Sequence, residues 1–252
     1  MMPRATSYAR RFTFLLGAGA LFVLGMMSPA TTRQGINFEV QTHRIPLYVK
    51  AVEFLDRDWQ YRLIAHEVTA GLASDSERAR ALFAWTRRRI RPTPAGLPVI
   101  DDHILHIIIR GYGQDDQMAD VFTTLSTYAG IPAFWKVVKS ANPPGRLVLS
   151  FARLNGRWAV FDVANGLIFL DHSKAPADQQ QLLMHPELIE AAAGVLAPGG
   201  IAYRRYLEAL PPFAVPSILR AQKQMPMHRI VFEARKALRL LPKDERMEAT
   251  HA

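Results

Sequence analysis

Residues 130–162 read GIPAFWKVVKSANPPGRLVLSFARLNGRWAVFD, and this stretch decides the fold. Gly130 and Pro132 end a preceding helix, because glycine suits the left-handed stop and proline cannot continue a helix. Three apolar runs rich in β-branched and aromatic residues follow, at Ala133–Val138, Leu147–Leu154 and Trp158–Asp162. Asn155-Gly156 between the last two predicts a tight hairpin, since both turn residues need positive φ. The stretch therefore predicts an antiparallel sheet.

Amphipathic helices precede this sheet in the chain. Apolar residues recur at helical spacing from Leu47 to Leu72. Ser74 and Glu77 have the spacing of a capping box, which predicts that a helix follows from Arg78 to Ile90. Another helix is expected from about Asp115 to Ala129.

Further elements are expected after the hairpin. They are a short strand at Leu167–Leu170 and helices at Asp178–Ala193 and Ser217–Leu241, the last interrupted by Pro226. Helices packed on an antiparallel sheet, with extra C-terminal helices, define an α+β fold. We expect one domain over residues 31–210, with its core at about 47–172, and a basic helical extension over 211–252.

Composition limits the chemistry. The chain has 252 residues, of which 49% are hydrophobic, and it has no cysteine. That excludes disulfides, cysteine-ligated metals and every thiol nucleophile. The net charge of +9 falls to +6 without Arg4, Arg10 and Arg11, which is compatible with anionic partners. No nucleic-acid-binding motif is present, so nucleic acid is not expected as a partner.

The N-terminus has the pattern of an export signal. Residues 1–11 are basic and free of acids, Phe12–Met27 is continuously apolar or small, and Ser28-Pro29-Ala30 follows. Residues 1–30 are therefore interpreted as a signal peptide or an N-terminal membrane anchor. We expect the protein to be exported, either periplasmic or anchored to the inner membrane and facing the periplasm.

The order of these parts resembles the transglutaminase-like superfamily, whose core is similar to that of papain-like cysteine proteases. The resemblance rests on residues 74–90 with Trp85, 111–117 (GYGQDDQ), 130–133 (GIPA) and 147–162. In that family a cysteine opens a helix, a strand carries a histidine and the next strand carries an aspartate. The resemblance implies a thiolate activated by the helix N-terminus and by the imidazole.

Carried onto this chain, the family pattern places Asp115 at the nucleophile, Leu147 (or Val148) at the histidine and Asp162 at the acid. The cysteine and the histidine are thus both missing.

The resemblance therefore implies a pseudoenzyme that acts as a binding or accessory module in the bacterial envelope, without a cofactor. Its expected partner is an envelope protein, a peptide or a polysaccharide. The groove would be lined by Asp115, Asp116, Gln117, Trp135, Trp158 and Asp162. A structural interpretation stands beside this one, in which Asp115 is the N-cap of its helix.

A second interpretation is a divergent hydrolase or transferase. Asp115 or Asp116 would work with His103 or His106 as acid and base. The β-branched run Ile104–Ile109 predicts a strand, which would turn the two histidines to opposite faces. For that reason no metal site is expected.

The C-terminal extension is basic and amphipathic over residues 217–243. Such a helix can lie on an anionic membrane surface or pack on its own domain.

Overall fold

The computed structural model describes residues 5–101, 103–194, 196–197, 199–210, 215–216, 218–238 and 240. The described residues form two compact units. The first takes in the residues up to Asp56 together with Ile100 and Asp101, and the second takes in the others.

The first unit contains helix α1 (Ala5–Met27) and a three-stranded sheet in the order β2-β1-β4. Its strands are β1 (Pro29–Ile36), β2 (Glu39–Pro46) and β4 (Ile100–Asp101). The β1–β2 hairpin is not predicted by the sequence analysis, because its strands are mostly polar and exposed and lack a regular apolar alternation. Within the described residues, no helix combines the length and apolar character that crossing a membrane requires.

The second unit contains the predicted antiparallel sheet, in the order β6-β7-β8-β9. Its strands are β6 (Ala133–Ala141), β7 (Pro144–Leu154), β8 (Arg157–Asp162) and β9 (Leu167–Ile168). Asn155 and Gly156 have φ of 50° and 81°, which confirms the predicted hairpin turn. Helices precede this sheet and follow it, so the α+β class is confirmed.

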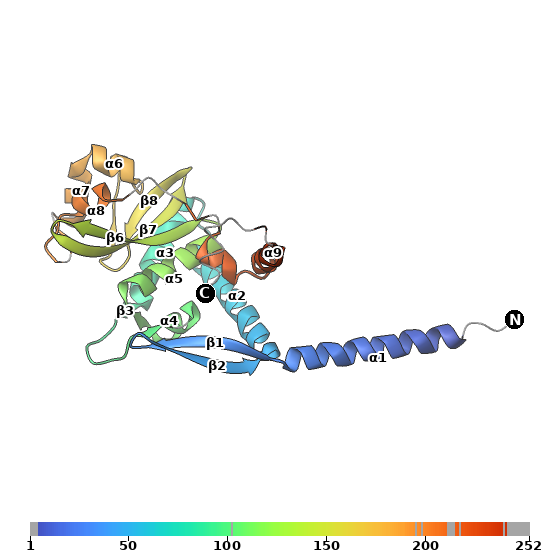
Figure 1. The fold of residues 1–252 in the computed structure, drawn as a ribbon. Coiled ribbons are helices and arrows are strands. Elements are labelled where there is room, and N and C mark those ends of the chain that lie inside the picture. Colours follow the sequence, from blue (N-terminus) through green and yellow to red (C-terminus); the bar gives the residue numbers. More distant parts are fainter. Residues whose placement is uncertain are drawn as a thin grey trace. The chain divides into compact units, whose positions relative to one another are not determined.

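Two hydrophobic cores lie on opposite faces of this sheet. One is built with α3 (Asp75–Arg89) and α5 (Asp115–Tyr128), and it contains Phe122 and Phe161. The other is built with α6 (Gln179–Met184), α7 (Pro186–Ala193) and α8 (Tyr203–Glu208). Figure 1 shows these two sets of helices on the two sides of the sheet. Strand β7 is therefore covered on both faces.

Local signals explain most helix boundaries. Helix α2 (Leu47–Thr69) matches its predicted range, and α3 begins at a complete capping box formed by Ser74 and Glu77. The predicted helix Asp178–Ala193 is two helices, because Pro186 starts α7 directly after α6 ends. Pro226 likewise begins α9 (Pro226–Ala237) after the 3₁₀ helix η1 (Arg220–Gln224), at the helix position that proline suits best.

The expected strand at Ile104–Ile109 is wrong. This segment is helix α4 (Ile104–Arg110), preceded by a loop and followed by Gly111 in the left-handed region at φ 75°. The parallel pair β3 (Arg91–Pro92) and β5 (Tyr112–Gly113) flanks it in the chain. The backbone N–H of Leu105 donates to the Tyr61 hydroxyl at 2.9 Å. A tertiary contact thus satisfies a free N–H at the start of the helix, and helical burial outweighs β propensity.

We expect Tyr61→Phe to lower the free energy of unfolding by about 1–3 kcal/mol, because it leaves the buried Leu105 N–H without an acceptor. Chemical denaturation followed by circular dichroism measures the change. Tyr112→Phe is the matched control in the same unit, since no hydrogen bond of the Tyr112 hydroxyl occurs among the described residues, and it should change stability by less than about 0.5 kcal/mol. Equal stability of the two variants would contradict this account of α4.

Candidate functional site

The N-terminus of α5 is held by its own side chains. Gln114, not Asp115, is the N-cap. The Gln117 Oε1 accepts the Gln114 backbone N–H at 3.0 Å and a guanidinium N–H of Arg110 at 3.3 Å. A Cβ at Gly113 would lie 3.0 Å from that same oxygen, so a larger residue there would crowd the Gln117 side chain. Gln117, predicted as a binding residue, is buried and ties the start of the helix together.

Asp115 is the first residue of α5, and its carboxylate is paired. One oxygen forms an ion pair with Arg146 of β7, and the other accepts the Asp116 N–H at 2.9 Å. The Asp115 side chain is 31% exposed and the Arg146 side chain 47%. The Asp116 carboxylate accepts the Gln117 N–H at 2.9 Å. At the predicted nucleophile position, the chain thus has a carboxylate held by a guanidinium.

Arg146 faces α5 because of the strand register. Arg146 pairs with Lys139 of β6. Trp135, which lies four residues before Lys139 on the same strand, pairs with Ser150 of β7. Since side chains alternate along a strand, Trp135 and Arg146 project from the same face, and both reach α5.

Leu147, the predicted histidine position, projects from the opposite face. It is buried in the core formed with α6, α7 and α8. The alternative position, Val148, has the register of the α5 face and pairs with Val137. The described residues next to Leu147 that face Asp115 are therefore Arg146 and Val148, and neither can accept and return a proton as an imidazole does.

Asp162 is fully buried at the end of β8. Its carboxylate accepts the backbone N–H of Asn165 at 3.0 Å, the Asn165 amide at 2.8 Å and the Tyr203 hydroxyl at 2.9 Å. Burial raises the pKa of Asp162 despite these bonds, and burial together with the nearby Asp162 charge raises the pKa of Tyr203. Asp162 thus holds the turn after β8 and ties it to α8.

Trp135 belongs to a polar network on the α5 face. Its indole N–H donates to Asp120 Oδ1 at 2.5 Å, and Arg220 of η1 forms an ion pair with Asp120 Oδ2 at 3.0 Å. Asp120 is only 5% exposed. The sequence analysis missed Asp120, although a carboxylate amid the apolar residues of a predicted helix is itself a signal of a buried polar contact.

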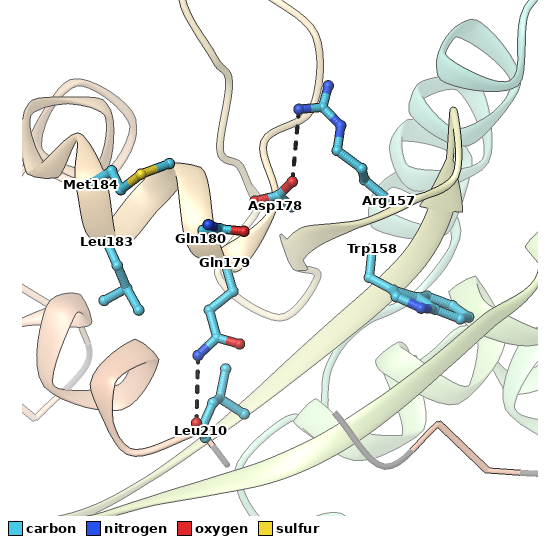
Figure 2. Close-up of a pocket in the computed structure, with 8 residues that line it drawn as sticks. All are labelled: Arg157, Trp158, Asp178, Gln179, Gln180, Leu183, Met184 and Leu210. Carbon is cyan, nitrogen blue, oxygen red and sulfur yellow. Dashed lines mark hydrogen bonds and ion pairs between the residues drawn. The ribbon is translucent and has the colours of Figure 1, made fainter. Parts of the chain in front are cut away.

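Trp158 lies on the other face of the sheet, where its ring packs edge-on against Phe134 at a centroid distance of 4.9 Å. It lines a groove of about 610 Å³ between β8 and α6. Arg157 and Asp178 approach each other to 3.8 Å at this groove (Figure 2). Its other lining residues are Gln179, Gln180, Leu183, Met184 and Leu210. Trp135 and Trp158 therefore lie on opposite faces of the sheet and cannot line one groove. The residues predicted to line a single groove are divided between these two faces.

His103 and His106 lie together at the start of α4. Their ring centroids are 5.9 Å apart, so the strand argument that separated them is wrong. Among the described residues, the carboxylates of Asp115 and Asp116 contact Arg146 and two backbone N–H groups, and no histidine. The acid–base grouping of these aspartates with a histidine stays a prediction without a contact to support it.

Comparison with known proteins supplies a family match. The model of the transglutaminase-like superfamily matches residues 62–162, from α2 to the end of β8. A search of the curated proteins finds no significant match.

Similar solved structures include a candidate cysteine protease from Cytophaga hutchinsonii (16% identity, TM-score 0.37), with 46% of this chain and 42% of that chain covered. Others are a candidate protease from Parabacteroides distasonis (11% identity, TM-score 0.36; 53% of this chain and 35% of that one) and a TGase (11% identity, TM-score 0.35; 57% and 46%). The chain spans less than half the length of each.

A double-mutant cycle tests the ion pair. We expect Asp115→Asn and Arg146→Met to be coupled by about 0.5–1 kcal/mol in the free energy of unfolding, a value typical of half-exposed pairs. The half-exposed pair Arg204–Glu208, within α8, serves as the reference cycle. High salt should reduce both couplings. Additive effects of the Asp115 and Arg146 substitutions would show that this pair does not fasten α5 to β7.

Proposed function

We propose that this chain, which carries a transglutaminase-like core at residues 62–162 and has no cysteine, acts as a binding or accessory module of the bacterial cell envelope. The supporting observation is the ion pair between Asp115 and Arg146. It lies at the helix N-terminus where the family pattern has a cysteine that works with a histidine.

The charges at this position oppose nucleophilic chemistry. One Asp115 oxygen is paired with Arg146 and the other accepts the Asp116 N–H. A carboxylate whose two oxygens are both engaged in this way is not free to attack a substrate. The helix and strands that carry the catalytic residues in the family pattern are present. The cysteine and histidine of that pattern are replaced by Asp115 and Leu147. This is the pattern expected of a binding module, and we favour it over a hydrolase or transferase built on Asp115 or Asp116.

The groove beside Trp158 has the character of a ligand site. It combines the partly exposed indole with two apolar side chains of α6, Leu183 and Met184. Charged and amide groups of Arg157, Asp178, Gln179 and Gln180 stand around them (Figure 2). An aromatic face next to several hydrogen-bonding groups suits a glycan or a short peptide. We propose a polysaccharide of the envelope as the ligand.

Helix α9 supports a location at a membrane surface. Met227, Ile230, Val231 and Leu238 follow helical spacing and are 46–70% exposed. Arg235 and Lys236 add positive charge in its last turn. Phe232 is buried on the remaining face, beneath Lys223 and Arg229. An exposed apolar stripe bordered by cations fits an anionic lipid surface. Residues 217, 239 and 241–243 of the predicted contact segment lie outside the described residues.

Export itself is proposed from residues 1–30. A basic start, an apolar run and a small-residue site form the pattern of a secretory signal. Binding to a polymer of the cell envelope requires such a location.

Glycan binding is tested with purified peptidoglycan sacculi and a chain of residues 31–252. We expect the chain to sediment with the sacculi, and Trp158→Ala to weaken binding about tenfold or more, as loss of a buried aromatic contact should. Trp59→Ala is the matched control, since Trp59 is 66% exposed on α2 and does not line the groove. Wild-type chain that stays in solution, or equal binding by both variants, would contradict the proposal.

Membrane contact is tested by flotation of the same chain with phosphatidylglycerol vesicles and with neutral phosphatidylcholine vesicles. We expect binding to the anionic vesicles only, lost at high salt and weakened by Ile230→Asp, because a charge would enter the apolar interface. Val137→Asp, at an exposed strand position, is the control and should bind as the wild type does. Equal flotation with both lipids, or unchanged flotation of Ile230→Asp, would contradict a role for α9.

A further inference from the structure

His172, His185 and Glu187 gather on the surface of the second unit. The Glu187 Oε1 lies 3.2 Å from His185 Nδ1 and 3.6 Å from His172 Nε2. One ligand atom from each residue lies within 4.8 Å of the other two. Among the described residues, this is the group of three or more side chains with the spacing that a metal ion needs.

We propose that these three side chains bind a divalent transition-metal ion of the zinc class. Zinc–nitrogen and zinc–oxygen bonds of about 2.0–2.1 Å place neighbouring ligand atoms of a tetrahedral site about 3.4 Å apart. The two separations to Glu187 already bracket that value. The ligand atoms of His172 and His185 lie within 4.8 Å of each other, and a tetrahedral ion bound by three side chains has a fourth position for water.

The backbone that carries His172 is rigidly organised. The neighbouring Asp171 carboxylate accepts from the Ser173 N–H at 2.9 Å, the Ser173 hydroxyl at 2.6 Å and the Ala175 N–H at 3.0 Å. The Asp171 N–H in turn donates to the Ala175 carbonyl at 2.8 Å. This loop follows β9 and is held by its own hydrogen bonds.

The other two ligands lie at the junction of α6 and α7. The His185 N–H donates to the Gln181 carbonyl at 2.9 Å, so it closes α6. Pro186 then starts α7, and Glu187 occupies its first turn. The Gln181 amide reaches Asp171 at 3.4 Å, which joins this junction to the loop of His172. A bound ion would therefore fasten the β9 loop to the helix pair whose α6 forms one wall of the groove.

The donor set selects the kind of ion. Two imidazoles and one carboxylate suit zinc, nickel, copper or iron, whereas magnesium and calcium prefer oxygen ligands alone. An exposed glutamate carboxylate is ionised at neutral pH, so Glu187 can serve as an anionic ligand. The three side chains are 46–65% exposed, so an ion can enter and leave without a change of fold.

Isothermal titration of the untagged, metal-stripped full chain with zinc chloride tests the proposal. We expect one zinc ion per chain, at least about tenfold weaker binding in His172→Ala, His185→Ala and Glu187→Gln, and no heat with magnesium chloride. His66→Ala, at another exposed histidine, is the matched control and should bind as the wild type does. Absence of zinc binding, or equal weakening by His66→Ala, would overturn the site.

Thermal unfolding gives an independent readout. Because zinc binds only the folded arrangement, the unfolding midpoint should rise with zinc concentration in the wild type and not in His172→Ala. Affinity should fall as the pH is lowered, since imidazole must be neutral to bind the ion. If the contacts are ordinary surface ion pairs, zinc will leave the midpoint unchanged, and this result would also overturn the proposal.

Discussion

Burial of strand β7 on both faces is the constraint from which the rest of the second unit follows. Every side chain from Leu147 to Ala152 is buried. A shift of one residue in register would move each of them to the other core, so the register is firmly specified. Alternate residues of β7 therefore face α5 or the later helices, and this alternation decides which side chains can meet Asp115.

The burial of β7 on both faces also explains which features of the fold could be predicted from the sequence. The Asn155-Gly156 hairpin and the Ser74–Glu77 capping box depend on neighbouring residues, and both were predictable. The face to which Leu147 projects was not predictable. A strand covered on both faces is a continuous apolar run, and such a run does not show which residues point to which side. Helix α4 was missed because Tyr61, distant in sequence, completes its N-terminus.

Three aspartates, two of them at the positions that the family pattern assigns to its nucleophile and its acid, hold elements of the fold together. Asp115 joins α5 to β7, Asp120 joins α5 to Trp135 and Arg220, and Asp162 joins β8 to Tyr203. Each carboxylate has specific partners, as buried or half-buried charges require. The polar contacts that fix these elements could be found only in three dimensions. The groove beside Trp158 lies on the opposite face of the sheet from the contacts of Asp115 and Asp120, on the face that also carries Tyr203.

The position of Arg146 has a consequence for any cysteine placed at residue 115. The guanidinium would stabilise a thiolate there. Neither Arg146 nor Val148 could deliver a proton to a leaving group. Such a thiolate would be open to oxidation without being able to complete a catalytic cycle. A single substitution at residue 115 would therefore create a redox-sensitive side chain and not a thiol enzyme.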